Sequence, residues 1–195
     1  MRIAIIGAGQ VGSRLMQLFS TAGHDARAIG RADMLEAEIS GGDVVVLAVP
    51  FAACADLLPR LAGALAGKIV VDVTNPVAPD WSPLRLGEEN SGAEEIARLL
   101  PRSRVVKAFN TIFADVMTPE KLTRDGQRVT CFVAGNDQDA RNAVAELADS
   151  AGFGALDVGT LPAARHLEAM AHLNIAVALS GGGTDAAFLY HHARH

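Results

Sequence analysis

The sequence of 195 residues has few of the features that mark secreted, metal-binding or nucleic-acid-binding proteins. Its two cysteines, Cys54 and Cys131, lie in apolar surroundings and lack C-x-x-C spacing. This pattern is typical of reduced thiols in a core and disfavours a disulfide framework or a metal site. Lysine and arginine number 17 and are interspersed with 22 acidic residues. No basic stripe therefore predicts binding to nucleic acid or to an anionic membrane.

Long hydrophobic runs are also missing from the sequence. No stretch reaches the roughly 18 apolar residues of a membrane span. The apolar run at residues 3–6 is too short for the core of a signal peptide. We therefore expect a cytoplasmic protein without a membrane partner. Half of the residues are hydrophobic and few are aromatic, which is the composition of a globular α/β core.

Short β-branched runs alternate along the chain with amphipathic segments of helical period. The alternation predicts an α/β protein with a Rossmann-type, doubly wound, mostly parallel sheet and a C-terminal helical extension. Ser91 is placed to cap one of the helices, with Glu94 at the capping-box spacing. Residues 77–90 are expected to form a loop over the end of the sheet. The expected strands are residues 3–6, 25–29, 44–49, 69–73, 105–109, 130–134 and 156–158, and the expected helices include residues 33–39, 56–65, 94–100, 139–150 and 165–180.

A glycine motif follows the first expected strand and opens the first expected helix. Gly7, Gly9 and Gly12 have the G-x-G-x-x-G spacing of a dinucleotide-binding loop. Gly7 permits a tight turn, Gly9 lets the backbone approach a pyrophosphate, and Gly12 lets the helix pack closely on the strand. We therefore expect a dinucleotide-binding domain over residues 1–162, with residues 163–195 forming a helix and tail packed on the same domain.

The choice between NAD and NADP depends on the end of the second expected strand. An acidic residue at this place binds the ribose hydroxyls of NAD, but this chain has Gly30 followed by Arg31. A small residue and a guanidinium give space and charge for a 2′-phosphate, which favours NADP. Asp33 keeps the alternative open, since its carboxylate could serve the ribose of NAD.

Several further segments point to a family because they occur in order through most of the chain. The sequence resembles the NADPH-dependent deazaflavin-coenzyme oxidoreductases and the related cytosolic reductase domain of the six-transmembrane metalloreductases. The segments that carry the resemblance are residues 5–12, 23–25, 30–31, 46–50, 72–76, 105–112, 133–137, 157–161 and 164–168.

The resemblance implies a set of residues that bind NADP. Phosphates would lie at the glycine loop, the 2′-phosphate at the end of the second strand, and a deazaflavin or flavin beyond Asn75 and Asn110 as second substrate. The span between Arg31 and Asp43 is shorter than the family usually has, which leaves a sheet strand or helix there in question. The implied cofactor-binding residues are Gly7, Gly9, Gln10, Val11, Gly12, Gly30, Arg31, Ala48, Val49, Pro50, Asn75, Pro76, Ala108 and Asn110.

No arrangement of acids, bases or nucleophiles stands out, and we assign no catalytic residue and no metal ligand. Hydride transfer between NADPH and a flavin-like acceptor is consistent with this, because the cofactors supply the reactive centres. A redox-inactive NADP-binding sensor is the alternative. A truncated imino-acid or hydroxy-acid dehydrogenase is a third hypothesis, but those enzymes need a sizeable helical domain after the sheet.

Lys107 has two possible roles, and the expected C-terminal helix points to a partner subunit. Lys107 follows two valines and could either extend from a strand end to solvent or touch a cofactor phosphate. The expected C-terminal helix is apolar nearly all round, so we expect a homodimer in which a second subunit covers part of it. Its large apolar residues are Leu167, Met170, Leu173, Ile175, Val177 and Leu179.

Overall fold

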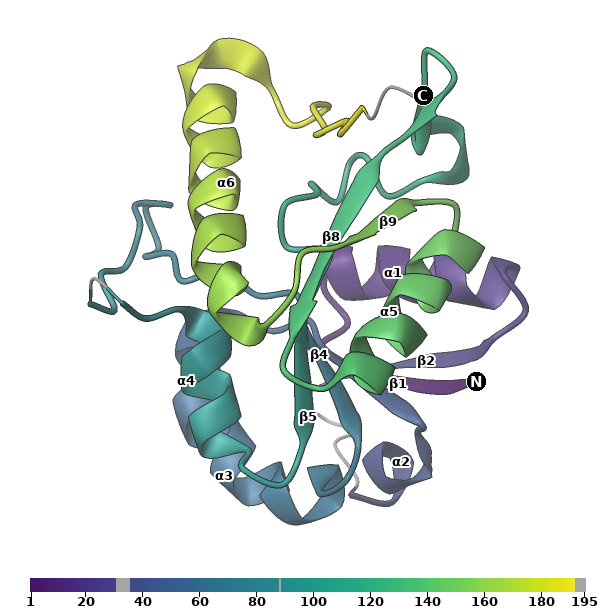
Figure 1. Cartoon of the computed structure of the whole chain (residues 1–195), viewed down its shortest axis with the longest axis vertical. Coiled ribbons are helices and arrows are strands. Elements are labelled where there is room, and N and C mark those ends of the chain that lie inside the picture. Colours follow the sequence, from purple (N-terminus) through teal and green to yellow (C-terminus); the bar gives the residue numbers. More distant parts are fainter. Residues whose placement is uncertain (31–35, 88, 192–195) are drawn as a thin grey trace.

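A computed structural model describes residues 1–30, 36–87 and 89–191 and shows a central sheet with helices on both faces (Figure 1). Within these residues the sheet has seven strands in the order β2-β1-β3-β4-β5-β8-β9, and a separate hairpin pairs β6 with β7. The strands are β1 Arg2–Ile6, β2 Asp25–Ile29, β3 Val44–Leu47, β4 Ile69–Asp72, β5 Arg104–Lys107, β6 Thr123–Arg124, β7 Gln127–Arg128, β8 Thr130–Gly135 and β9 Gly154–Asp157.

The helices follow the strands in the expected alternation. Ser91 caps α4 as predicted, since its Oγ accepts a hydrogen bond from the Glu94 amide at 3.2 Å. The helix expected over residues 33–39 is seen as α2, and residues 33–35 lie outside the described residues. The α-helices are α1 Gln10–Thr21, α2 Glu36–Gly41, α3 Cys54–Leu65, α4 Gly92–Leu99, α5 Gln138–Ser150 and α6 Ala164–Val177, with short 3-10 turns at Phe51–Ala53, Pro119–Lys121 and Leu161–Ala163.

Side chains of the parallel strands alternate between two apolar layers. Along β1, Ile3 and Ile5 pack into the layer formed with α1 and α5, whereas Ala4 and Ile6 pack into the layer formed with α3 and α4. β3 pairs with β1 on one side and β4 on the other, and all four of its residues are buried. A strand buried on both faces explains the uninterrupted run of valines. The Rossmann-type, mostly parallel sheet is confirmed.

β8 departs from the parallel pattern. It pairs antiparallel with β5, through Val106 opposite Gly135 and Lys107 opposite Ala134. A parallel crossover needs a connection long enough to return to the other end of the sheet, usually through a helix. The connection from β5 to β8 is described throughout and contains a 3-10 turn and the β6–β7 hairpin in place of an α-helix. The chain therefore re-enters the sheet in the opposite direction.

The C-terminal part of the chain packs against the sheet and the adjacent helices. α6 is followed by a wide π-type turn at Ala178–Gly182, so the helix ends earlier than the expected residue 180. The tail then runs back toward β8, where the Thr130 amide donates to the Phe188 carbonyl at 3.0 Å. The Tyr190 amide donates to Thr130 Oγ1 at 2.8 Å. Figure 1 shows α6 standing beside β8, above α4.

Both cysteines are free and buried, as the sequence predicts. Burial raises the pKa of the Cys54 and Cys131 thiols to about 12, so both stay protonated and unreactive at neutral pH. Among the described residues, no helix is long and apolar enough to cross a membrane.

Candidate functional site

The carboxyl ends of β1 and β3 form the crevice in which a doubly wound sheet binds its ligands. The chain leaves β1 toward β2 on one side, and β3 lies on the other, so this is the switch point of the sheet. The Ala48 amide donates to the Ile6 carbonyl at 2.8 Å. Gly7 has φ +117°, and a Cβ on it would lie 2.2 Å from the Ala48 carbonyl oxygen. Only glycine fits at this turn.

The N-terminus of α1 opens onto the same crevice. Gly9 is its N-cap and provides no side-chain hydrogen bond to the first-turn amides. In the described part of the chain a Cβ on Gly9 would have nothing within 4 Å, whereas a Cβ on Gly12 would lie 1.9 Å from the Gly7 carbonyl oxygen. The helix thus packs tightly at Gly12 and leaves open space and uncapped amides at Gly9. These are the conditions for holding a pyrophosphate.

The other predicted cofactor residues differ in their accessibility. Gly30 is half-buried directly after β2, and Arg31 lies outside the described residues. Ala48 and Val49 are half-buried and Pro50 is exposed, all at the carboxyl end of β3 next to the glycine loop. Pro76 is buried. Ala108 has no exposed surface because it packs in the core, so it supports the site from beneath and does not line it.

A cavity of about 450 Å³ adjoins the glycine loop. It is bounded by the start of α1, by the chain after β4 and β5, and by α6 with its extension. Its walls are mostly apolar, and Asp115 is the one ionisable side chain among the described residues that line it. The lining residues are Gln10, Val11, Val73, Asn75, Trp81, Phe109, Asn110, Thr111, Ile112, Phe113, Ala114, Asp115, Ala171, Asn174, Ile175, Ala178, Leu179 and Thr184.

Two asparagines form a polar pair in the wall of this cavity. Asn75 Nδ2 donates to the Asn110 carbonyl at 2.8 Å, and Asn110 Nδ2 donates to Asn75 Oδ1 at 2.9 Å. Asn110 Nδ2 also donates to the Leu167 carbonyl of α6 at 3.1 Å. Asn110 Oδ1 is buried and finds no partner in the described part of the chain, so it is free to accept a hydrogen bond from a ligand.

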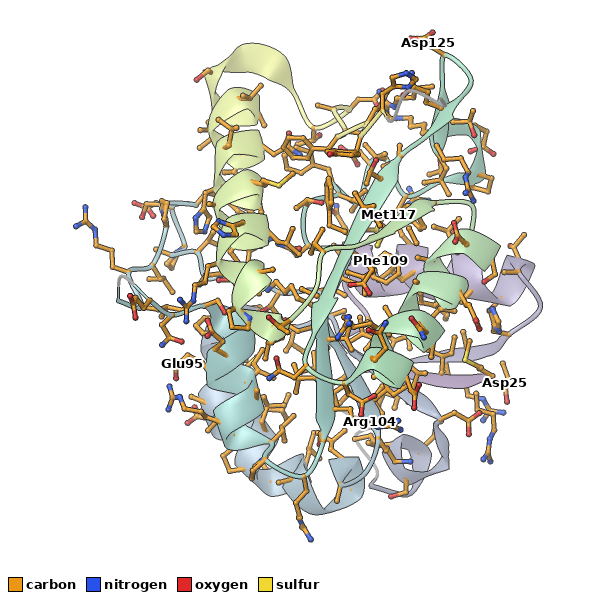
Figure 2. The ribbon with its side chains drawn as sticks, in the orientation of Figure 1. Asp25, Glu95, Arg104, Phe109, Met117 and Asp125 are labelled. Carbon is orange, nitrogen blue, oxygen red and sulfur yellow. The ribbon has the colours of Figure 1, made fainter. Side chains whose placement is uncertain are left out.

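Phe109 lines the cavity and has an unusual backbone. Its φ is +61°, a region that bulky residues rarely adopt. Its ring lies in the interior of the molecule (Figure 2) and packs edge-on against Phe19 and Phe153, with centroids 5.9 and 5.4 Å away. Such backbone strain costs about 1–3 kcal/mol and concentrates at ligand sites. The left-handed backbone at Phe109 cannot continue a strand, and β5 ends at Lys107, two residues before the expected end.

A buried ion cluster underlies the site. Lys107 Nζ lies 2.9 Å from Asp72 Oδ2 and 2.9 Å from Glu168 Oε1 of α6, and it donates to the Thr74 carbonyl at 2.6 Å. Both expected roles of Lys107 are therefore wrong, since it reaches neither solvent nor the glycine loop. Burial alone would lower the pKa of Lys107, but the two carboxylates outweigh it and raise the pKa. The ammonium stays charged.

Glu168 also binds the start of α4. Its Oε2 accepts from the Gly92 amide at 2.9 Å and its Oε1 from the Ala93 amide at 3.2 Å. One carboxylate thus satisfies two first-turn amides and one ammonium, and it joins α6 and α4 to Lys107 of β5. This role of Glu168 was not predicted, because a lone glutamate in an apolar helix is ordinarily placed at the surface.

Sequence reasoning also missed most of the apolar cavity wall. Trp81, Phe113, Ile175 and Leu179 come from three separate segments and meet only in the folded chain. The apolar character of α6 was a usable signal, because Ile175 and Leu179 line the cavity. Fold and site together define a Rossmann-type dinucleotide-binding protein with a second, apolar cavity beside the dinucleotide crevice.

Comparisons with known proteins identify the family. The sequence profile described as NADP oxidoreductase, coenzyme F420-dependent, matches residues 35–76. The F420-dependent NADP reductase of Methanocaldococcus jannaschii is 32% identical over 179 residues, covering 85% of this chain and 79% of that protein. A crystal structure from Arthrobacter sp. FB24, assigned as an F420-dependent NADP-reductase, has a TM-score of 0.86 at 28% identity and covers 98% of this chain and 100% of that one.

Metalloreductase STEAP3 of Rattus norvegicus is 40% identical over 135 residues, which cover 69% of this chain and 26% of that protein. The chain thus spans about a quarter of the length of this metalloreductase. It belongs to the family of coenzyme F420-dependent NADP oxidoreductases.

Proposed function

We propose that the protein transfers a hydride between NADPH and a deazaflavin or flavin-type acceptor in the cytoplasm. The observation that carries this proposal is the shared wall between the two sites. Gln10 and Val11 belong to the glycine loop and also line the apolar cavity, together with Asn75 and Asn110. A nicotinamide that extends from a pyrophosphate at the loop would enter this cavity, with about 450 Å³ of space around it.

The nicotinamide supplies a hydride, which with one proton from water reduces the acceptor by two electrons and leaves NADP⁺. The protein's part is to bind, orient and exclude water. The α1 amides hold the pyrophosphate, the apolar walls exclude water, and Asn110 Oδ1 accepts an N–H from a ring or carboxamide. The absence of an acid or base other than Asp115 in the described lining suits a transfer that needs no positioned proton donor.

Anaerobic oxidation of NADPH, followed at its own absorbance band, tests the proposal. Riboflavin, FMN, 5-deazariboflavin and a ferric chelate are offered as acceptors. Reduction of at least one of the ring acceptors, with NADPH consumed in equal amount, supports it. Tight binding of NADPH without turnover of any acceptor would favour the redox-inactive sensor, and the proposal would then be wrong.

Replacing Gly9 with alanine should weaken NADPH binding without destabilising the fold. The new methyl group meets no atom of the described residues within 4 Å, but it fills the space through which a pyrophosphate approaches the backbone. Losing one charge-assisted hydrogen bond of about 1.5–3 kcal/mol raises the Kd by roughly tenfold or more. Calorimetric titration and urea unfolding measure the two effects.

Gly63→Ala is the matched control, because a Cβ at Gly63 also has no described residue within 4 Å and Gly63 lies in α3, outside the site. It should bind NADPH as the wild type does. Equal affinity of Gly9→Ala and wild type would exclude the loop as the pyrophosphate site.

The outer face of α6 is proposed to form a homodimer contact. Leu173 is 59% exposed and Val177 48%, while Leu167 and Ala171 on the opposite face are buried. Such an apolar stripe is typical of an interface. Light scattering should give the mass of a dimer at micromolar concentration, and Leu173→Glu should shift it to a monomer. A monomeric wild type would contradict the proposal.

A further inference from the structure

A tryptophan at the mouth of the cavity has no role in the core. Trp81 is the only tryptophan of the chain, and it is 58% exposed. It lines the same cavity as Asn75 and Phe109. Tryptophan is enriched at interfaces, because its large apolar face gains from being covered.

The segment that carries Trp81 is a hydrogen-bonded hairpin. The Leu84 amide donates to the Pro76 carbonyl at 2.8 Å, and the Ala78 amide donates to the Ser82 carbonyl at 2.8 Å. At the tip, Asp80 Oδ1 accepts from the Ser82 amide at 3.1 Å and from its hydroxyl at 2.7 Å. These hydroxyl and amide bonds hold the pKa of Asp80 below its usual range.

The hairpin holds Trp81 in an unfavourable backbone conformation. Its φ is +69°, in the left-handed region where a bulky residue is rarely found. The hairpin begins directly after Asn75, whose side chain is bound to Asn110. The hairpin therefore anchors the backbone of Trp81 near the polar pair, and its side chain lines the same cavity. Backbone strain of this kind concentrates at ligand sites, which makes Trp81 a candidate for a ligand contact.

We propose that Trp81 stacks on the ring of the redox acceptor and selects planar, uncharged aromatic rings. The inference rests on the proposed function and names the residue that determines its second substrate. The mostly apolar lining, with Asp115 as its one ionisable group in the described residues, suits an uncharged ring and disfavours an anion close to it. An indole stacks on the face of any flat π-system, and the stacking does not depend on the hydrogen-bonding groups at the edge of that ring.

Fluorescence of the single tryptophan tests the contact directly. Riboflavin should quench the emission of the NADP⁺-bound protein in a saturable way, and stacking predicts loss of intensity with an unchanged lifetime of the remaining emission. NADP⁺ alone, which does not absorb in the emission band, is the reference. A shortened lifetime would mean that Trp81 lies near the acceptor without stacking on it, and the inference would be wrong.

Steady-state kinetics separate stacking from a merely structural role. Trp81→Ala should raise the KM for riboflavin at least about fivefold and leave the KM for NADPH within about twofold, since stacking contributes only to the acceptor. Trp81→Phe should restore most of the loss. Leu84→Ala is the matched control on the same hairpin, because Leu84 is 36% exposed and does not line this cavity. It should leave both KM values unchanged.

The kinetic and fluorescence experiments distinguish a failure of the stacking inference from a failure of the proposed function. If NADPH reduces a flavin or deazaflavin and Trp81→Ala changes both KM values equally, or neither, then the stacking inference is wrong and the proposed function stands. If riboflavin quenches Trp81 with the stacking signature but no acceptor is reduced, the ring site stands and the proposed function is wrong.

Discussion

Replacing Lys107 with methionine is expected to lower the free energy of unfolding by about 3–5 kcal/mol, because one partner of a buried ion cluster is removed. Lys107 and Asp72 have no exposed surface, and Glu168 is 4% exposed. Methionine has a similar shape, so the change mainly removes charge. Asp72 and Glu168 would then be left as buried carboxylates without their shared cation. The loss is a large share of the roughly 5–15 kcal/mol that stabilises a typical domain.

Urea unfolding of wild type and Lys107→Met measures the loss. Arg2→Met is the matched control, because Arg2 pairs with Asp43 at 3.5 Å on the surface, with side chains 64% and 52% exposed. An exposed pair of this kind contributes at most about 1 kcal/mol. If Lys107→Met is no less stable than Arg2→Met, the buried cluster does not hold the fold together as described.

The pH dependence of this contribution follows from the raised pKa of Lys107. A base whose pKa is higher in the folded state stabilises fully below its unfolded value of about 10.4, and the stabilisation is lost as the pH rises through the folded pKa. The carboxylates of Asp72 and Glu168 cause the rise against the opposing effect of burial. The contribution of Lys107 should therefore be constant near neutral pH and decline only in strongly alkaline solution.

Local patterns in the sequence predicted the fold because each depends on near neighbours. The alternation of Ile3, Ala4, Ile5 and Ile6 follows from the pleat of a strand, and the two layers of the structure reproduce it. The glycine loop was predictable for the same reason. A short turn, an open approach and a close packing contact each demand glycine at a fixed spacing, whatever the rest of the chain does.

The cavity could not be predicted in the same way, because long-range contacts build it. Lys107, Asp72 and Glu168 are far apart in sequence, and no spacing rule relates an acid in α6 to a lysine at the end of β5. The left-handed backbone of Phe109 also has no sequence signal, since the residue is not glycine or asparagine. The family resemblance supplied Asn75 and Asn110, but it did not supply Trp81 or the walls from α6.

The second large expected effect is a difference in affinity between NADPH and NADH. Arg31 follows Gly30 at the end of β2, and no acid stands at Gly30 to repel a 2′-phosphate. A charge-assisted hydrogen bond from guanidinium to phosphate contributes roughly 1.5–3 kcal/mol, which is about 10- to 150-fold in affinity. NADPH should therefore bind at least about tenfold more tightly than NADH at moderate salt.

Calorimetric titration of two variants tests this assignment. Arg31→Ala should weaken NADPH by the same factor and leave NADH nearly unchanged, since only NADPH presents a phosphate to this side chain. Adding Gly30→Asp should reverse the preference, because the carboxylate repels the 2′-phosphate and accepts hydrogen bonds from the ribose hydroxyls. If Arg31→Ala weakens both cofactors equally, Arg31 is not the discriminating residue, and Asp33 with NAD becomes the better assignment.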